Sequence, residues 1–530
     1  MLLQGITECS PQWIVSIIFG AIVARLIHNK YGHGISHVPG PFLAAYTDLW
    51  RFFVVFGRRP ELNYIALHEK YGDVVRVGPK ALSFADPASA KTIYAINSGF
   101  TKSDFYPVQR TLAQGNEVQS LFNIQNEELH AKLRRQVSTA YAMSTLVQFE
   151  PLVDSTACLL VKELDNRFAD VQGDEGICDL GAWLQYYAFD VIGQLMASKG
   201  FGFLEEGRDI DSIIFQIKKM LDYVAPIGQI PVLDKWLLKN PVRRLLSRWG
   251  MLPSASSIPN FANKCLQERL ASDKPPEHRD FLSRFLELHQ KDPNFITLHR
   301  VLSLAVSNVF AGSDTTAVTL RAIFYHLLRN PDKLQTLLDE LADAEEKGIL
   351  GSQTTAPWKV VSGLPYLSAV VTEALRLHPA VGLPLERVTP AGGAVLSGLH
   401  VPAGVIVGCS AWVLHRNEIF GPEPDAFRPE RWIESPPKQL QLMQNSLLAF
   451  GGGSRTCIGK NISLLEIYKV VPLILRNFEI ILAYPEKEWS LRNSWFVLQD
   501  DFYVRLKRKT ARAIGATGNT HVETATSKQF

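Results

Sequence analysis

Most of the chain carries apolar residues at helical spacing. Six segments repeat them every three or four positions, at 146–168, 182–197, 298–328, 333–344, 362–377 and 458–482. A helix with such a stripe buries it against its neighbours. The pattern therefore predicts a fold built mainly from α-helices.

Strand patterns occur in only two places. From Lys70 to Asp86, apolar and polar residues alternate on either side of Gly78 and Pro79, which predicts a strand pair around a turn. Short apolar runs at 394–399 and 405–409, with Gly and Pro between them, predict a small second patch of sheet. The expected fold class is mainly α with minor β, of the α+β type.

Two further segments are predicted to lack regular structure. Residues 200–276 contain several prolines and glycines and have weak periodicity, which is typical of an irregular lid. Residues 509–530 are small and polar, and we expect a disordered tail there.

The N-terminus holds a separate apolar stretch from Trp13 to Ala24, followed by Arg25, His28 and Lys30. It is short for a full span of about 20 residues, although Arg25 can extend toward the membrane surface. No positive region precedes it and no cleavage pattern follows, so a retained signal anchor is favoured over a cleaved signal peptide. A buried N-terminal helix is the alternative. The Pro-rich segment 38–41 predicts a stiff hinge after residues 1–36.

Composition narrows the function classes. With 530 residues, 46% of them hydrophobic, the chain can bury a large core in one domain or in two to three smaller ones. A net charge of only +3 argues against a nucleic-acid partner. The six cysteines are far apart, with no CxxC pair, so neither a disulfide framework nor a zinc site is indicated.

Cys457 lies at the centre of a glycine-rich loop, Phe450-Gly-Gly-Gly-Ser-Arg455-Thr-Cys457-Ile-Gly459. Glycines let the main chain bring its N–H groups close to the sulfur, and the helix pattern that follows places the sulfur near a helix N-terminus. Both features favour a thiolate of the kind that binds haem iron. A phosphate-binding loop is excluded because Ser454 and Asn461 replace residues that its motif requires.

The predicted helix 298–328 contains Ala311-Gly312-Ser-Asp314-Thr315-Thr316 inside an apolar pattern. Ala311 and Thr315 share one face, as do Gly312 and Thr316, so a notch of small residues lies one turn before a hydroxyl. The notch can admit a ligand. The alternative is a packing notch in which the threonine bonds the backbone carbonyl one turn earlier.

These strings together resemble the cytochrome P450 family, in its order and at its separations, over about residues 39–507. The loop from Phe450 to Gly459 matches the family's haem-binding motif, and the helix string matches the segment over the distal side of the haem. The resemblance implies that Thr315 and Asp314 handle protons, that Ala311 and Gly312 lie against the cofactor, and that Cys457 is the axial ligand of haem b. It also implies a single catalytic domain over residues 37–508 with the cytochrome P450 fold.

Glu373-Ala-Leu-Arg376 places opposite charges on one helix face, which by itself is typical of a solvated surface pair. Its apolar flanks instead indicate a buried helix, where the pair requires a further partner. The resemblance supplies Arg431, from Phe427-Arg-Pro-Glu-Arg431, and implies that the three residues form a structural triad. His415 is expected to be structural.

The two propionates of haem are carboxylates, and arginine is suited to bind them because its guanidinium group can donate two parallel hydrogen bonds. By motif position the resemblance implies Arg455, Arg387 and Arg134 for this role. His130 is a further candidate because it stands where the family more often has tryptophan; a surface imidazole is the alternative.

The resemblance implies a microsomal monooxygenase, close to the fungal enzymes of secondary metabolism. It inserts one oxygen atom from O2 into a lipophilic small molecule, within walls predicted to include Phe310, Val381, Leu383 and Phe496. No flavin motif is visible in the sequence. Electrons are therefore expected from a NADPH-cytochrome P450 reductase, with cytochrome b5 as a further possible partner, docking near three basic residues, Lys132, Arg135 and Lys460.

The resemblance also implies an endoplasmic reticulum membrane location, with one anchor in the lipid bilayer and the catalytic domain in the cytosol. Two alternatives remain at this point: a haem-thiolate isomerase or dehydratase that does not use O2, and a non-catalytic haem-binding sensor. Both leave Asp314 and Thr315 without a role.

Overall fold

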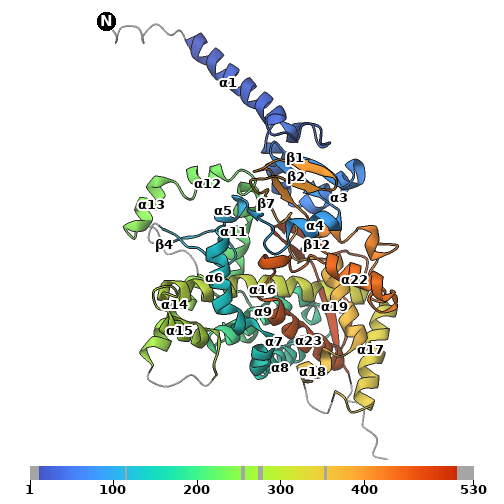
Figure 1. The fold of residues 1–530 in the computed structure, drawn as a ribbon. Coiled ribbons are helices and arrows are strands. Elements are labelled where there is room, and N and C mark those ends of the chain that lie inside the picture. The colour runs from blue at the N-terminus through green and yellow to red at the C-terminus, as the bar shows by residue number, and fades with distance from the viewer. Residues whose placement is uncertain (1–10, 114–115, 252–256, 273–277, 351–354, 510–530) are drawn as a thin grey trace, which may run out of the picture.

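The computed structural model describes residues 11–113, 116–251, 257–272, 278–350 and 355–509. The predicted tail lies outside these ranges except for its first residue, Lys509. Helices dominate, as the spacing of apolar residues predicts, and strands form small sheets at the periphery (Figure 1).

The helices of the first half are α1 (Pro11–Tyr31), α2 (Leu49–Phe56), α3 (Pro60–Tyr71), α4 (Pro87–Ile93), α5 (Phe105–Val108), α6 (Glu127–Val137), α7 (Met143–Leu146), α8 (Glu150–Phe168), α9 (Leu180–Ala197), α10 (Phe203–Glu206), α11 (Ile213–Ile227), α12 (Val232–Trp236) and α13 (Pro241–Arg248). Those of the second half are α14 (Ser257–Ala271), α15 (Phe281–Lys291), α16 (Leu298–Arg329), α17 (Pro331–Glu346), α18 (Trp358–Val361), α19 (Pro365–Leu377), α20 (Ala411–Leu414), α21 (Arg431–Glu434), α22 (Pro437–Ser446) and α23 (Lys460–Asn477).

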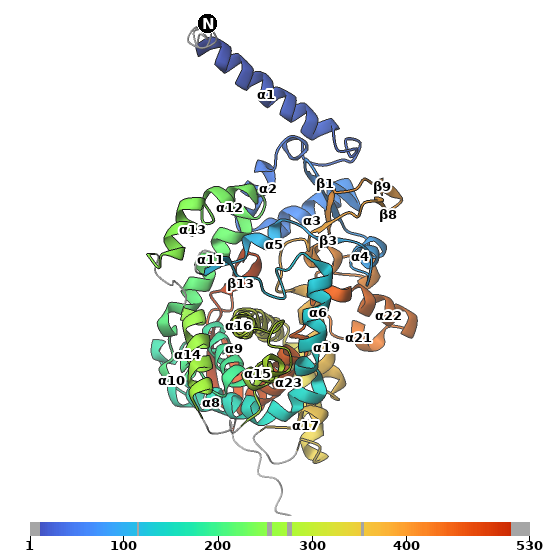
Figure 2. The same ribbon diagram turned by 60° about the vertical axis from the view of Figure 1, so that its left-hand side comes forward.

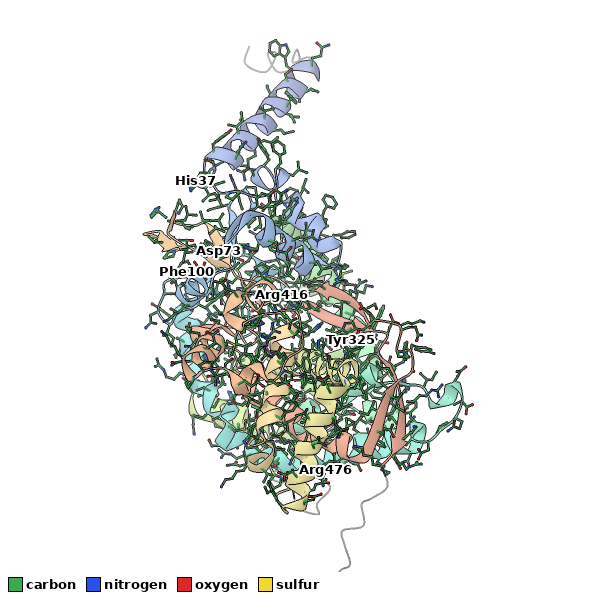
Figure 3. All side chains as sticks on the ribbon, turned by 90° about the vertical axis from the view of Figure 1, so that its right-hand side faces the viewer. His37, Asp73, Phe100, Tyr325, Arg416 and Arg476 are labelled. Carbon is green, nitrogen blue, oxygen red and sulfur yellow. The ribbon has the colours of Figure 1, made fainter. Side chains whose placement is uncertain are left out.

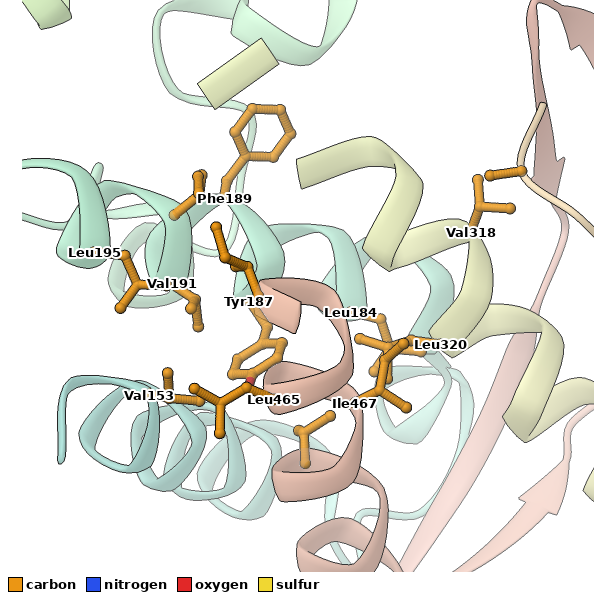
Figure 4. Packing of buried hydrophobic residues seen from close by; sticks show 14 of the residues in the cluster. Val153, Leu184, Tyr187, Phe189, Val191, Leu195, Val318, Leu320, Leu465 and Ile467 are labelled. Atoms are coloured by element: carbon orange, nitrogen blue, oxygen red, sulfur yellow. The ribbon is translucent and has the colours of Figure 1, made fainter. Parts of the chain in front are cut away.

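A core of long helices holds the molecule together. Helix α16 runs through the middle of the fold, packed along α9, and α23 and α8 complete the bundle (Figure 2). Figure 4 shows the contact: Tyr187 of α9 lies beside Leu465 of α23 and Val153 of α8. Helix α9 is buried almost all round, which explains its continuous apolar sequence.

The main sheet has five strands in the order β1-β2-β10-β7-β3, formed by Val74–Gly78, Ala81–Phe84, Ile406–Gly408, Arg387–Val388 and Thr101–Lys102. Strands β1 and β2 pair antiparallel around Pro79, so the predicted strand pair is confirmed.

The predicted second patch is only partly right. Strands β8 (Ala394–Leu396) and β9 (Leu399–Val401) form a separate hairpin, but β10 joins the main sheet by pairing parallel to β2. Pairing across more than 300 residues has no signal in a local pattern.

Two segments differ from the sequence-based expectation. Residues 200–276 contain α11, α13 and α14, so the prediction of irregular structure there was wrong. Prolines at helix starts, such as Pro241, are compatible with a helix but were interpreted as signs of irregular structure. The last predicted helix ends at Asn477, where β11 (Phe478–Leu482) begins. This strand pairs with β14 (Tyr503–Arg508), and β14 pairs with the short β6 (Cys178–Asp179).

A second hairpin, β12 (Ser490–Ser494) and β13 (Phe496–Asp500), turns at Trp495. Its strands were not predicted. Trp495 has a φ of +86°, a value that a bulky side chain adopts only where its surroundings hold it. The remaining strands, β4 (Leu112–Ala113) and β5 (Asn116–Glu117), pair with each other.

Helix α1 projects away from the body, and its side chains contact little of the rest (Figure 3). Within Gln12–Tyr31 an 18-residue window has a mean hydropathy of 1.4, and none of that window is buried. The alternative of a buried N-terminal helix is therefore wrong. A helix of this length is about 30 Å long, which matches the hydrocarbon thickness of a bilayer, so α1 is compatible with a membrane anchor.

Candidate haem-thiolate site

The loop around Cys457 is closed by its own backbone. The Cys457 N–H donates to the Phe450 carbonyl at 2.8 Å, and Gly451 and Gly453 have φ values of +67° and +59°. A Cβ at Gly453 would lie 1.8 Å from the Tyr94 carbonyl oxygen, so only glycine fits. Gly459 has an ordinary φ of −82°, so its backbone does not require glycine. It is the residue immediately before α23.

Cys457 lies just before the N-terminus of α23, as predicted from the helix pattern. The backbone N–H groups of Gly459 and Lys460 and the Arg134 guanidinium favour negative charge on its sulfur and lower the pKa of the thiol. Its position deep in the protein, away from bulk water, nevertheless raises the pKa of the Cys457 thiol, and these groups offset that effect only in part. A metal ion bound to the sulfur would remove the remaining preference for the proton.

Residues Asn308–Thr316 form the polar string of α16. Hydrogen bonds at both ends of this string connect it, directly or through Tyr141, to the start of α23. Buried Tyr141 donates its hydroxyl to Asn308 Oδ1 at 2.6 Å and accepts from Asn461 Nδ2 at its carbonyl at 3.0 Å. Thr316 Oγ1 donates to Ser463 Oγ at 3.0 Å. Residues 308–316 therefore lie against residues 461–463, a few residues beyond Cys457.

Within this string the side chains divide between two faces. Ala311 and Cys457 are both exposed, although α16 crosses the middle of the molecule, so each faces an accessible internal surface. Gly312 is closely packed against α9, because a Cβ at this position would lie 3.0 Å from the Ile192 side chain. Thr315 is half-buried, and its hydroxyl donates to the Ala311 carbonyl at 2.8 Å, the back-bonded arrangement that the sequence left open.

Asp314 points to the opposite side, into a buried network between α16 and α9. It accepts a hydrogen bond from Gln185 Nε2 at 2.6 Å, and Gln185 Oε1 accepts one from Arg321 at 2.8 Å. Burial raises the pKa of Asp314 to about 6, against the lowering effects of Gln185 and Arg321. The carboxyl thus changes its charge close to neutral pH. Gln185 and Arg321 were not identified from the sequence, because long-range partners leave no local signal.

Four of the predicted cofactor ligands meet around one cavity of about 530 Å³. His130 and Arg134 of α6, Arg387 of β7 and Arg455 of the cysteine loop all line it. Arg134 also donates to the Thr456 carbonyl at 2.8 Å, which joins α6 to the loop. His130 is buried, so the surface alternative is wrong. Burial and the neighbouring cations lower the pKa of His130 to about 3 and keep it neutral.

The charges around this cavity fit a haem with two propionates. Arg455 binds Glu127 through Nε and Nη2, while its buried Nη1 has no hydrogen-bond partner among the described residues. Lys102, Arg134, Arg387 and Arg455 act on one another with Glu127 as the acidic member, so in this group four basic side chains stand against one acidic side chain. Two propionates and one thiolate carry the matching negative charge.

The three residues of the predicted structural triad meet, fully buried. Glu373 accepts hydrogen bonds from Arg376 at 2.8 and 2.9 Å and from Arg431 at 2.9 Å. Trp432 Nε1 adds a bond at 2.8 Å. Burial would raise the pKa of Glu373, but the two guanidiniums outweigh it and hold the pKa below its usual range. The surface-pair alternative is excluded for Glu373 and Arg376, both 0% exposed.

The predicted substrate-pocket residues do not line the cavity described above. Val381 and Phe496 form an isolated antiparallel bridge, and Leu383 is buried close by. Phe310 is half-buried on α16, next to Ala311. An aromatic cluster adjoins them, in which Trp495 packs on Phe105 with ring centroids 5.0 Å apart.

Comparison with known proteins agrees with this geometry. The family model described as Cytochrome P450 matches residues 45–503. The chain is 41% identical over 504 residues to cytochrome P450 monooxygenase cicH of Emericella nidulans, covering 94% of this chain and 98% of the relative. It is 42% identical over 479 residues to a cytochrome P450 monooxygenase of Aspergillus terreus, covering 89% and 95%. Cytochrome P450 monooxygenase mpaDE of Penicillium roqueforti is 38% identical over 95% of this chain, which spans 59% of that longer relative.

Proposed function

Because the chain belongs to the cytochrome P450 family, we propose that Cys457 is the axial ligand of its haem iron. The protein is a haem-thiolate monooxygenase, and its relatives carry that activity in their names. The bound haem supplies the activation of O2 and the transfer of one oxygen atom. The observation that supports Cys457 is the sulfur at the N-terminus of α23, with backbone N–H groups directed at it and a surplus of positive charge beside it.

The spectrum of the reduced protein with carbon monoxide tests the ligand. Cys457→Ser is expected to abolish the thiolate-type Soret band. Cys158→Ser, at a half-buried cysteine on α8, is the matched control and should leave the band unchanged. A thiolate-type band that survives in Cys457→Ser would overturn the proposal.

Thr315 and Asp314 are the proposed proton-handling residues. Thr315 presents a hydroxyl on the accessible face of α16, next to Ala311, while Asp314 holds an exchangeable proton in the buried network behind it. A pKa of about 6 for Asp314 suits proton transfer near neutral pH. Thr315 therefore serves at the site and Asp314 supplies it from inside the protein.

The two electrons are proposed to come from a NADPH-dependent reductase that docks on the α6 side of the cysteine loop. Lys132 and Arg135 are exposed on α6, and Lys460 is exposed at the start of α23. The bond from Arg134 to Thr456 brings these two elements together, so the three cations border one surface close to Cys457. An acidic partner surface would complement them.

Helix α1 is proposed to anchor the enzyme in the endoplasmic reticulum membrane with the catalytic domain in the cytosol. The basic residues in and near its last turn, Arg25, His28 and Lys30, support this orientation. The substrate is proposed to be a lipophilic secondary metabolite, since the relatives are fungal enzymes and the predicted pocket residues Val381 and Phe496 adjoin the aromatic contact between Phe105 and Trp495. The domain limits 1–36 and 37–508 stay predictions.

A further inference from the structure

The last turn of α1 is joined to the body of the protein. The last four carbonyl groups of an α-helix have no partner within the helix. In α1 the His28 carbonyl accepts a hydrogen bond from the Gly32 N–H at 2.7 Å, whereas the Asn29 and Lys30 carbonyls accept from a side chain of the body. That side chain is Arg76 of β1, a strand that lies beside the end of α1 (Figure 1). We call residues 29–30 the foot of α1.

Arg76 is a buried cation, 2% exposed, whose hydrogen bonds to the described residues all go to backbone carbonyls. Its guanidinium donates to the Asn29 carbonyl at 2.7 Å and to the Lys30 carbonyl at 2.9 Å. Nη2 also donates to the Pro79 carbonyl at 2.8 Å, and Nε to the Gly78 carbonyl at 3.3 Å. A cation is favourable at a helix C-terminus because the carbonyl end carries partial negative charge. One side chain therefore bridges the foot of α1 and the turn that follows β1.

The chain that follows α1 is fastened to the same strand. The Arg76 N–H donates to the Pro39 carbonyl at 2.7 Å. A Cβ at Gly40 would lie 2.1 Å from the Arg76 carbonyl oxygen, so this close approach requires glycine. The segment 38–41, predicted to be a stiff hinge, is therefore held against β1.

The side chains of the foot add contacts from a third direction. Asn29 Nδ2 donates to the Tyr46 carbonyl at 2.6 Å, and Lys30 Nζ donates to the Tyr46 hydroxyl at 3.0 Å. The Lys30 ammonium also lies 5.1 Å from the centroid of the Tyr46 ring. Since the foot is held by residue 46 as well as by Arg76, α1 has no single bond about which it can pivot.

We propose that Arg76 is the positioning residue of a rigid joint, which holds α1 at a fixed angle to the catalytic domain and so keeps one face of the domain toward the bilayer. The inference rests on the proposed membrane anchor. A flexible tether would instead let the domain turn freely below α1. Phe42 is 72% exposed, and its ring centroid lies 5.9 Å from the Lys30 ammonium. The joint therefore keeps this apolar side chain at the level where α1 leaves the bilayer.

The test measures the angle of α1 in the full-length holoenzyme, in phosphatidylcholine nanodiscs, by pulsed dipolar EPR. Spin labels on a genetically encoded ketone amino acid replace Val15 of α1 and Lys91 of α4, both exposed, and leave the native cysteines unlabelled. Val15 lies about 22 Å along the helix from Lys30, so a change of angle moves its label by several times the displacement at the foot.

The wild type should give one narrow distribution of label distances, and Arg76→Met should at least double its width. The matched control is Arg505→Met, on β14, which removes a guanidinium that donates to the Gly173 carbonyl far from α1. It should keep the wild-type width. A broad distribution in the wild type, or an unchanged width in Arg76→Met, would overturn the proposal.

A second variant separates the joint from general support of the fold, since Arg76 also bonds carbonyls within the catalytic domain. If Arg76→Met loses the thiolate-type Soret band or does not accumulate, the double variant Asn29→Gly and Lys30→Gly decides. It removes the bonds to Tyr46 and destabilises the helical turn that presents two carbonyls to Arg76. Its distribution should be at least twice as wide while the Soret band stays. A wild-type width in this folded variant would contradict the joint.

The same measurement in detergent micelles distinguishes the joint from contacts with lipid. The wild-type distribution should stay narrow there, because the bonds of Arg76 do not depend on a bilayer. A distribution that is narrow only in nanodiscs would show that lipid sets the angle of α1, and would overturn the proposal. Failure of the membrane anchor itself would be recognised separately, since the wild-type protein would then not float with phosphatidylcholine vesicles in a density gradient.

Discussion

His415 Nε2 accepts a hydrogen bond from the backbone N–H of Leu448 at 2.7 Å, nine residues before Cys457. The other ring nitrogen, Nδ1, lies 2.8 Å from the Arg376 carbonyl, which fixes the neutral tautomer with its proton on Nδ1. Burial lowers the pKa of His415 to about 3, so the ring stays neutral. One imidazole therefore joins the Glu373 cluster to the start of the cysteine loop.

His415→Ala should weaken haem retention as well as the fold. The change leaves the Leu448 N–H and the Arg376 carbonyl without their partner, at a cost of about 1–3 kcal/mol for each buried group. We expect a lower midpoint of thermal unfolding and a smaller haem-to-protein ratio after purification. His400→Ala, at an exposed histidine of β9, is the control. Full haem content in His415→Ala would show that the loop holds its shape without this bond.

Glu373→Gln should destabilise the protein strongly. The substitution leaves Arg376 and Arg431 buried without a negative partner, and breaking such a pair costs about 3–5 kcal/mol. Urea unfolding followed by tryptophan fluorescence measures the loss. Glu434→Gln, which breaks a surface pair with Arg428, should cost less than about 1 kcal/mol. Similar losses for the two variants would contradict a structural role of the cluster.

Thr315→Ala should divert electrons from product to hydrogen peroxide. The side-chain hydroxyl is lost from the accessible face of α16 while the helix is kept, because alanine is the best helix former. NADPH consumption, peroxide and product are measured together in the reconstituted enzyme. Thr319→Ala is the matched control, since Thr319 makes the same kind of back-bond one turn later, to the Thr315 carbonyl at 3.1 Å, on a buried face. Equal coupling in both variants would remove Thr315 from proton handling.

The raised pKa of Asp314 predicts that the stability of the fold decreases as the pH rises toward 6. Its folded-state pKa of about 6 lies above the ordinary 3.8, so the folded protein binds the proton more tightly than the unfolded chain does. Stability from this group is present below about pH 4 and falls as the pH rises to about 6, by about 2–3 kcal/mol in all. Asp314→Asn should flatten this part of the stability profile and abolish an inflection near pH 6 in coupled turnover. An unchanged turnover profile would exclude Asp314 from the rate-controlling proton step.

Neutralising Lys132, Arg135 and Lys460 together, each to Gln, should weaken reductase binding and reduce its dependence on salt concentration. Exposed charges act mainly on association, which ionic strength screens. Titration of turnover with reductase at two salt concentrations measures both effects. A matched triple change at three exposed lysines elsewhere, Lys70, Lys91 and Lys359, controls for net charge. Identical affinity and salt dependence in the two triple variants would refute this docking surface.

Local patterns predicted the elements whose cause is local. The spacing of apolar residues located α9, α16, α17 and α19 to within a few residues, because each helix buries one continuous stripe or its whole surface. Local patterns failed where pairing between distant segments decides whether a segment becomes a strand or a helix. Strand β11 is a strand rather than the end of α23 because β14 pairs with it along its whole length. The helices between residues 200 and 276 are interrupted by Pro and Gly, which weakens their periodicity.

The same division holds for the site. Cys457, Thr315 and the Glu373–Arg376 pair belong to strings whose residue types and spacing are visible in the sequence alone, because each string is a single loop or helix turn. Arg431, 58 residues beyond Glu373, was supplied only by the resemblance to the family. Gln185 behind Asp314, Lys102 opposite Arg387, and His415 beneath Leu448 have no such signal. Their partners lie 129, 285 and 33 residues away in the chain, respectively. The sequence by itself thus determined the helical class, the thiolate loop and the polar string of α16. Tertiary structure decided which buried charges face one another, because desolvation and pairing depend on neighbours that only folding brings together.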